Sequence, residues 1–195
     1  PSCGSWNTLA EVAAREPGSR RTSGGSARSG KGEREGGGAV SLRAVEAREN
    51  VRRLTGIGEL DRVLGGGAMV GSSILIGGEP GIGKSTLMLQ AAAELSRSSK
   101  VLYISGEESA QQIRLRADRL GASDRDLDLL CETNLHQIVD YLSDKRPEVV
   151  VVDSIQTIFS DEAGAVPGTV GQIKYATGEL VEWARHLACG AHIGK

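Results

Sequence analysis

Aromatic side chains are scarce in this sequence, at 3% of its 195 residues. Proteins that hold single-stranded nucleic acid by stacking bases on aromatic rings need such side chains, so this composition argues against that mode of binding. No run approaches the roughly 18 consecutive apolar residues that span a bilayer, and we expect no membrane contact. The only three cysteines lie far apart, at Cys3, Cys131 and Cys189. Their spacing argues against a disulfide framework and indicates a reducing cytoplasm.

Charge is distributed unevenly along the chain. Residues 1–53 carry ten basic and six acidic side chains, a net charge of +4, whereas residues 54–195 carry thirteen and nineteen, a net charge of −6. The basic part suits either contact with nucleic acid or a solvated linker, and its composition leaves both open. From Pro17 to Gly38 the chain is rich in Gly, Ser and Arg without apolar periodicity. We therefore predict a disordered linker over residues 13–39 and a folded domain over residues 40–195.

Short apolar runs bounded by glycine or polar residues predict buried strands. They occur at residues 73–76, 101–104, 128–131 and 149–152. Apolar side chains at helical spacing predict helices over residues 58–64, 84–96 and 169–188, and further helices that begin at Ser109 and Asn134. Continuous apolar strands that alternate with helices indicate an α/β fold, with a parallel sheet covered on both faces and the ligand at the carboxyl ends of the strands. Cys131, inside a predicted strand, is expected in the core.

One segment matches the phosphate-binding pattern G-x-x-x-x-G-K-S. It reads Gly78-Glu79-Pro80-Gly81-Ile82-Gly83-Lys84-Ser85 and is followed by Thr86. Glycines allow backbone N–H groups to point at phosphate oxygens, and the helix that follows adds a partial positive charge at its N-terminus. Lys84 is expected to reach the β- and γ-phosphates, and the Ser85 hydroxyl to ligate Mg²⁺. The segment, which we call the P-loop, therefore predicts a site for a nucleoside triphosphate, which we take to be ATP, with Mg²⁺.

Carboxylates follow two of the predicted strands. Asp153 ends a run of four valines and is expected to provide the second contact to Mg²⁺, although an Asp in this position could instead cap a turn. Glu107 lies in the string Ser105-Gly106-Glu107-Glu108-Ser109, where a carboxylate could orient and deprotonate an attacking water. Glu108 competes for that role, and both could simply be acidic residues in the first turn of a helix. We assign Lys84 and Glu107 as catalytic, and Ser85 and Asp153 as Mg²⁺ ligands.

Several segments match a known family in combination. They are residues 55–67, the P-loop, residues 101–109, residues 132–135 and residues 151–157. Together they resemble the bacterial RadA (Sms) family, DNA-repair ATPases of the RecA superfamily. The string from Ser105 to Ser109 and the string Asp153-Ser154-Ile155-Gln156-Thr157 are far more specific than the P-loop alone. The resemblance covers nearly everything except the linker and implies a RecA-like P-loop ATPase core.

The resemblance also implies a function and partners. RadA-type proteins are DNA-stimulated ATP hydrolases of repair and recombination, which act on branched or single-stranded DNA and work as a homo-hexamer. The family opens with a four-cysteine zinc module, and residues 1–12 resemble its end, with Cys3 as the fourth ligand. Because one thiolate cannot complete a tetrahedral site, we expect no zinc in this chain itself. The family continues beyond the position of Lys195, so we expect this piece alone to be incomplete and poorly active.

Two other functions stay open on the sequence. A KaiC-like ATPase or kinase shares the Thr55-Gly56-Ile57 opening and the P-loop, although the Cys3-to-Trp6 segment and the Ser105–Ser109 string argue against it. A nucleotide-dependent DNA-binding adaptor with little hydrolysis belongs to a different class. Turnover of ATP with and without single-stranded DNA distinguishes the adaptor from a DNA-dependent ATPase.

Overall fold

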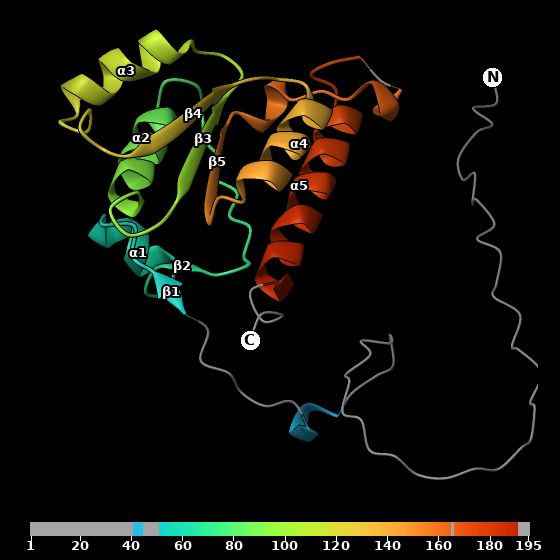
Figure 1. The fold of residues 1–195 in the computed structure, drawn as a ribbon, viewed down its shortest axis with the longest axis horizontal. Coiled ribbons are helices and arrows are strands. Elements are labelled where there is room, and N and C mark those ends of the chain that lie inside the picture. The colour runs from blue at the N-terminus through green and yellow to red at the C-terminus, as the bar shows by residue number, and fades with distance from the viewer. Residues whose placement is uncertain (1–40, 45–50, 165, 191–195) are drawn as a thin grey trace, which may run out of the picture. The chain divides into compact units, whose positions relative to one another are not determined.

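Three parallel strands form the centre of the fold (Figure 1). They are β3 (Val101–Ser105), β4 (Leu127–Cys131) and β5 (Val149–Asp153), in the spatial order β4-β3-β5. The computed structural model describes residues 41–44, 51–164 and 166–190. It divides into two units, residues 1–46 and 47–195. The first contributes only the short 3-10 helix η1 (Leu42–Ala44) to the described residues. The predicted linker and Cys3 lie outside them.

Helices cover both faces of this sheet, as predicted. On one face lie α2 (Lys84–Leu95) and α3 (Ala110–Arg119), and on the other α4 (Leu135–Lys145) and α5 (Val170–Gly190) (Figure 1). Alternation along β3 separates the two cores, because successive side chains of a strand point to opposite faces. Val101 and Tyr103 pack with α2 and α3, whereas Leu102 and Ile104 pack with α4. The predicted α/β class, with a parallel sheet between helices, is confirmed.

Local capping signals set several helix boundaries. Ser109 and Gln112 form the predicted capping box at the start of α3, and the Asn134 side chain accepts from two backbone N–H groups at the start of α4. The predicted helix over 58–64 is α1 (Gly58–Val63). Besides η1, the elements without a sequence prediction are the antiparallel pair β1 (Arg52–Arg53) and β2 (Ala68–Met69) and the 3-10 helices η2 (Ile155–Thr157) and η3 (Asp161–Ala163).

The strand predicted over residues 73–76 is wrong. The segment has no regular secondary structure, and Ile74 and Leu75 are 47% and 85% exposed. A short apolar run becomes a strand only when a neighbour completes its hydrogen-bond ladder and other layers cover its side chains. Within the described residues β5 pairs with β3 alone, so residues 73–76 have no ladder partner. Cys131 also differs from expectation, because it ends the edge strand β4 and is exposed.

Among the described residues, no helix combines the length and the apolar composition that crossing a bilayer requires.

Replacement of glycine by alanine is expected to change the free energy of unfolding in opposite directions at two positions. Gly178 lies within α5, and a Cβ there would meet nothing within 4 Å. Because glycine costs conformational entropy inside a helix, Gly178→Ala is expected to raise the free energy of unfolding by about 0.5–1 kcal/mol. Gly106 follows β3, and its Cβ would lie 2.0 Å from Thr157 Oγ1. Gly106→Ala is expected to lower that free energy by roughly 1–3 kcal/mol.

Urea unfolding followed by circular dichroism measures both effects against the unsubstituted protein. A Gly178→Ala protein less stable than the parent would contradict the open surroundings described for this residue.

Candidate nucleotide-binding site

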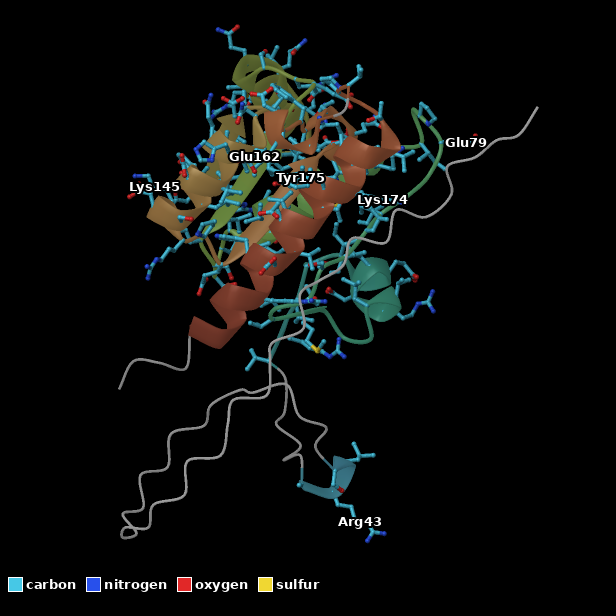
Figure 2. All side chains as sticks on the ribbon, turned by 90° about the vertical axis from the view of Figure 1, so that its right-hand side faces the viewer. Arg43, Glu79, Lys145, Glu162, Lys174 and Tyr175 are labelled. Carbon is cyan, nitrogen blue, oxygen red and sulfur yellow. The ribbon has the colours of Figure 1, made fainter. Side chains whose placement is uncertain are left out.

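The P-loop connects the irregular segment before it to the first turn of α2. Gly81 and Gly83 adopt positive φ angles of 80° and 100°, and α2 begins directly afterwards at Lys84. Such angles are readily accessible only to glycine. The Lys84 ammonium donates to the backbone carbonyl oxygens of Gly78 and Glu79 at 2.9 and 2.8 Å, so it is folded back over the start of the loop. Glu79 itself projects from the outer side of the loop (Figure 2).

Asp153 lies beside the P-loop although 68 residues separate it from Ser85 in the sequence. Its Oδ1 accepts a hydrogen bond from Ser85 Oγ at 3.0 Å, and its Oδ2 accepts one from the Tyr103 hydroxyl at 2.6 Å. Burial, followed by the hydrogen bond to Asp153 and its negative charge, raises the pKa of Tyr103 far above its ordinary value. The phenol is therefore neutral and acts as the donor. The packing of α2 against the parallel sheet thus brings the P-loop hydroxyl and the predicted second metal contact together.

The donor atoms at this point fit Mg²⁺ better than zinc. Mg²⁺ prefers hard oxygen ligands and takes one or two protein groups together with phosphate oxygens and water. The Ser85 hydroxyl and the Asp153 carboxylate supply that type of ligand. Within residues 41–44, 51–164 and 166–190 there is no group of three or more His, Cys, Asp or Glu side chains that could hold a metal ion. The zinc ligand predicted at Cys3 lies outside these ranges.

The two adjacent glutamates have different surroundings. Glu107 is exposed, and its Oε1 accepts from Ser154 Oγ at 2.7 Å and from Gln156 Nε2 at 3.3 Å. Glu108 instead forms an ion pair with Arg116 of α3, whose side chain is only 15% exposed. Glu107 therefore lies among polar groups that follow β5 next to Asp153, whereas Glu108 compensates the charge of a largely buried guanidinium. The geometry favours Glu107 over Glu108 for contact with water at the site.

Sequence reasoning assigned no role to Tyr103, Ser154 or Gln156. Tyr103 interrupts an apolar strand with a hydroxyl group, and a buried tyrosine hydroxyl usually has a hydrogen-bond partner. That signal indicates that a partner exists but cannot identify it. Ser154 and Gln156 belong to the string quoted for the family resemblance, but their contact with Glu107 depends on the pairing of β3 with β5.

Two clefts lie at opposite ends of the sheet. One of about 240 Å³ lies at the carboxyl ends of β3 and β4, next to Gly106, Glu107 and Thr133. A larger one of about 580 Å³ lies at the amino ends of the strands, and charged residues of both signs line it. Ligands of open α/β sheets bind outside the carboxyl ends of the strands. We therefore assign the ligand site to the carboxyl ends of the strands, where Asp153 meets the P-loop, although the cleft at the amino ends is larger.

The chain is similar to one family model and to several known proteins. A family model described as "ATPase: KaiC" matches residues 53–146, which include the P-loop and Glu107. The fold and this match are consistent with a RecA-like P-loop ATPase core. The chain is 46% identical to the DNA repair protein RadA of Treponema pallidum, 44% to that of Bacillus subtilis and 45% to that of Brucella abortus.

These alignments cover nearly all of this chain. They include 100%, 95% and 94% of it, but only 42%, 40% and 40% of the three relatives. The chain is thus homologous to the bacterial RadA proteins over almost its whole length, which confirms the resemblance seen in the sequence. It spans about two fifths of the length of the curated relatives that it matches.

The different surroundings of the two glutamates predict different effects on stability. Glu108→Gln removes the charge that compensates Arg116, so the free energy of unfolding should fall by about 1–2 kcal/mol. Glu107→Gln changes an exposed side chain and should alter it by less than about 0.5 kcal/mol. Urea unfolding of the two isosteric variants makes the comparison. Equal loss of stability in both would show that the Glu108–Arg116 pair contributes nothing particular to the fold.

Proposed function

We propose that this chain carries the ATP-hydrolysing core of a DNA-repair protein. The observation that supports this proposal best is the 3.0 Å hydrogen bond between Ser85 of the P-loop and Asp153 at the end of β5. In P-loop ATPases a hydroxyl and a carboxylate from these two positions hold the metal ion that accompanies the nucleotide phosphates. A phosphate-binding motif that arose by chance would have no reason to lie against such a carboxylate.

The side chains around this hydrogen bond have distinct proposed roles. Backbone N–H groups of the segment from Gly78 to Thr86, in which Pro80 has none to donate, bind phosphate oxygens. Lys84 exchanges its contacts with the loop carbonyls for the β- and γ-phosphates. Ser85 and Asp153 hold Mg²⁺, which neutralises charge on the phosphates when it is bound. Glu107 accepts a proton from the attacking water, because it is exposed and lies next to the groups that follow Asp153.

The DNA partner of the proposal comes from the relatives, whose names describe DNA repair. We infer action on single-stranded or branched DNA, hydrolysis stimulated by DNA, and a homo-hexamer in the cytoplasm as the working form. We further propose that residues 40–195 form the ATPase domain, after a linker and the end of a zinc module to which Cys3 contributes in the whole protein. The full activity belongs to that whole protein, because this chain covers only part of its relatives.

A KaiC-like ATPase without a DNA partner is the second candidate, and the family match over residues 53–146 favours it. The homology to RadA proteins extends beyond that region over 94–100% of the chain, so we rank DNA repair first. An adaptor with little hydrolysis is the third. ATP turnover by the whole protein, with and without single-stranded DNA, separates all three. DNA should increase turnover in the first case, leave it unchanged in the second, and both rates should be negligible in the third.

Lys84 provides the most direct test of the P-loop. Its charge matters more in the transition state, where negative charge on the transferred phosphoryl group increases, than in the ground state. Lys84→Ala in the whole protein is expected to lower kcat for ATP by on the order of 10² or more. Lys145→Ala is the matched control, because Lys145 is an exposed lysine at the end of α4, away from Glu79 and the loop (Figure 2). Turnover by Lys84→Ala close to that of the control would refute the P-loop assignment.

Glu107 tests the proposed activation of water. Glu107→Gln preserves the size of the side chain but removes the base, so ATP and Mg²⁺ should bind with unchanged affinity while kcat falls by roughly 10² to 10⁴. Binding of a fluorescent ATP analogue and single-turnover hydrolysis separate the two effects. If Glu108→Gln abolished hydrolysis and Glu107→Gln did not, the base would be the other glutamate.

A further inference from the structure

The Asp153 carboxylate has two partners, one for each oxygen. Ser85 Oγ donates to Oδ1 at 3.0 Å and the Tyr103 hydroxyl donates to Oδ2 at 2.6 Å. Both side chains reach Asp153 on the same face of the sheet. Tyr103 and Val151 are register partners and pack in the core under α2 and α3, and Asp153 follows Val151 by two residues along β5. Side chains two apart along a strand share a face. Asp153 therefore meets Ser85 from α2 and Tyr103 from β3.

We propose that Tyr103 is a positioning residue that holds the Asp153 carboxylate with Oδ1 turned toward Ser85 and the P-loop. The proposal rests on the function proposed above, in which Ser85 and Asp153 serve the Mg²⁺ that accompanies the nucleotide. It adds a residue from another strand, which neither the P-loop motif nor the acidic end of β5 identifies.

Asp153 needs a second hydrogen bond because a carboxylate can rotate about its last side-chain bond. This torsion is broad in Asp, so one hydrogen bond to Ser85 leaves the plane of the group poorly defined. A second, short hydrogen bond to a charged oxygen defines it, because O–H···O⁻ contacts near 2.6 Å are among the strong ones. The donor is itself rigid: the Tyr103 side chain is 1% exposed and packs against Leu89, Ile113 and Val151. A buried aromatic ring with few accessible rotamers is an accurate support for a functional group.

The packing of Tyr103 alone does not require its hydroxyl. A phenylalanine would occupy the same apolar volume, with the same neighbours from α2, α3 and β5. If the Tyr103 hydroxyl needed only some hydrogen-bond partner, any acceptor would serve. Here the acceptor is the carboxylate whose other oxygen contacts the P-loop. Removal of the hydroxyl should consequently weaken the site for the metal ion rather than the phosphate-binding loop.

The test is Tyr103→Phe in the whole protein. We measure the affinity for a fluorescent, non-hydrolysable ATP analogue while Mg²⁺ is titrated, and again in EDTA. The Mg²⁺ concentration at half-saturation should rise roughly tenfold, as is common when a side chain that supports a metal ligand is lost. Affinity in EDTA should stay within about twofold of the parent, because the P-loop is unchanged.

Tyr175→Phe is the matched control. Its hydroxyl also donates to a carboxylate, Glu162 Oε2, at 2.9 Å, but this pair joins α5 to η3 at the surface (Figure 2). Its Mg²⁺ half-saturation should equal that of the parent protein. A double variant, Tyr103→Phe with Asp153→Asn, should need no more Mg²⁺ than Asp153→Asn alone, because Tyr103 acts only through this carboxylate.

Several results would overturn the proposal. A Tyr103→Phe protein with lower stability but the Mg²⁺ half-saturation of the parent would make the hydroxyl purely structural, and so would a protein that no longer folds. Equal shifts in Tyr103→Phe and Tyr175→Phe would show a nonspecific effect. If the parent protein bound the analogue equally well with Mg²⁺ and with EDTA, the proposed function would fail together with this inference, whereas the first results leave that function intact.

Discussion

The parallel pairing of β3 with β4 and β5 is the constraint on which the site depends. It places Ser105 opposite Asp153 on one side and Cys131 on the other, so that the three strands end at the same edge. The pairing continues one step further, because the Gly106 backbone N–H donates to the Asp153 carbonyl oxygen at 3.2 Å. The loops that follow β3 and β5 are consequently held against each other. Glu107 reaches Ser154 and Gln156 for this reason, and not through any closeness in sequence.

Close approach of these loops depends on the absence of a side chain at Gly106. A Cβ would lie 2.0 Å from Thr157 Oγ1 and 3.0 Å from Thr133 Cγ2. Any other residue would force apart the segments after β3, β4 and β5, which carry the proposed base Glu107 and adjoin the proposed metal contact Asp153. Further along, Gln172 of α5 bonds both the N–H and the carbonyl oxygen of Ser160 through its buried amide. These two hydrogen bonds connect the segment that follows η2 to α5.

Because side chains alternate along a strand, one face of the sheet carries both part of the apolar core and the carboxylate of the candidate site. The residues of β5 that face α2 and α3 are Val149, Val151 and then Asp153, so the same face that packs the apolar core ends in a carboxylate next to the P-loop helix. Tyr103 lies on this face of β3 with its ring in the core and its hydroxyl on the carboxylate. Homology to the RadA proteins covers all of these elements. Asp153, the proposed metal ligand, is thus held from the side of the hydrophobic core.

Much of the architecture could be predicted from the sequence because its signals are local. The P-loop needs only eight consecutive residues, the capping box needs Ser109 and Gln112, and the apolar runs of β3 and β5 indicate buried strands without knowledge of their neighbours. The α/β class follows from the alternation of apolar runs with helical segments. The position of Asp153 in the site was expected because Asp153 ends a buried strand, at the edge of a parallel sheet where ligands bind. For these features the sequence alone was sufficient.

The remaining features depend on contacts between segments far apart in the sequence. Residues 73–76 have the composition of a strand but no ladder partner within the described residues, so their Ile74 and Leu75 are exposed. Glu107 and Glu108 are equivalent in sequence, and only the packing of Arg116 and the position of Ser154 distinguish them. The hydrogen-bond acceptor of the Tyr103 hydroxyl could likewise not be predicted from the sequence. Local propensity indicates what a residue can form, whereas strand pairing and the burial of individual polar groups are decided only when the chain has folded.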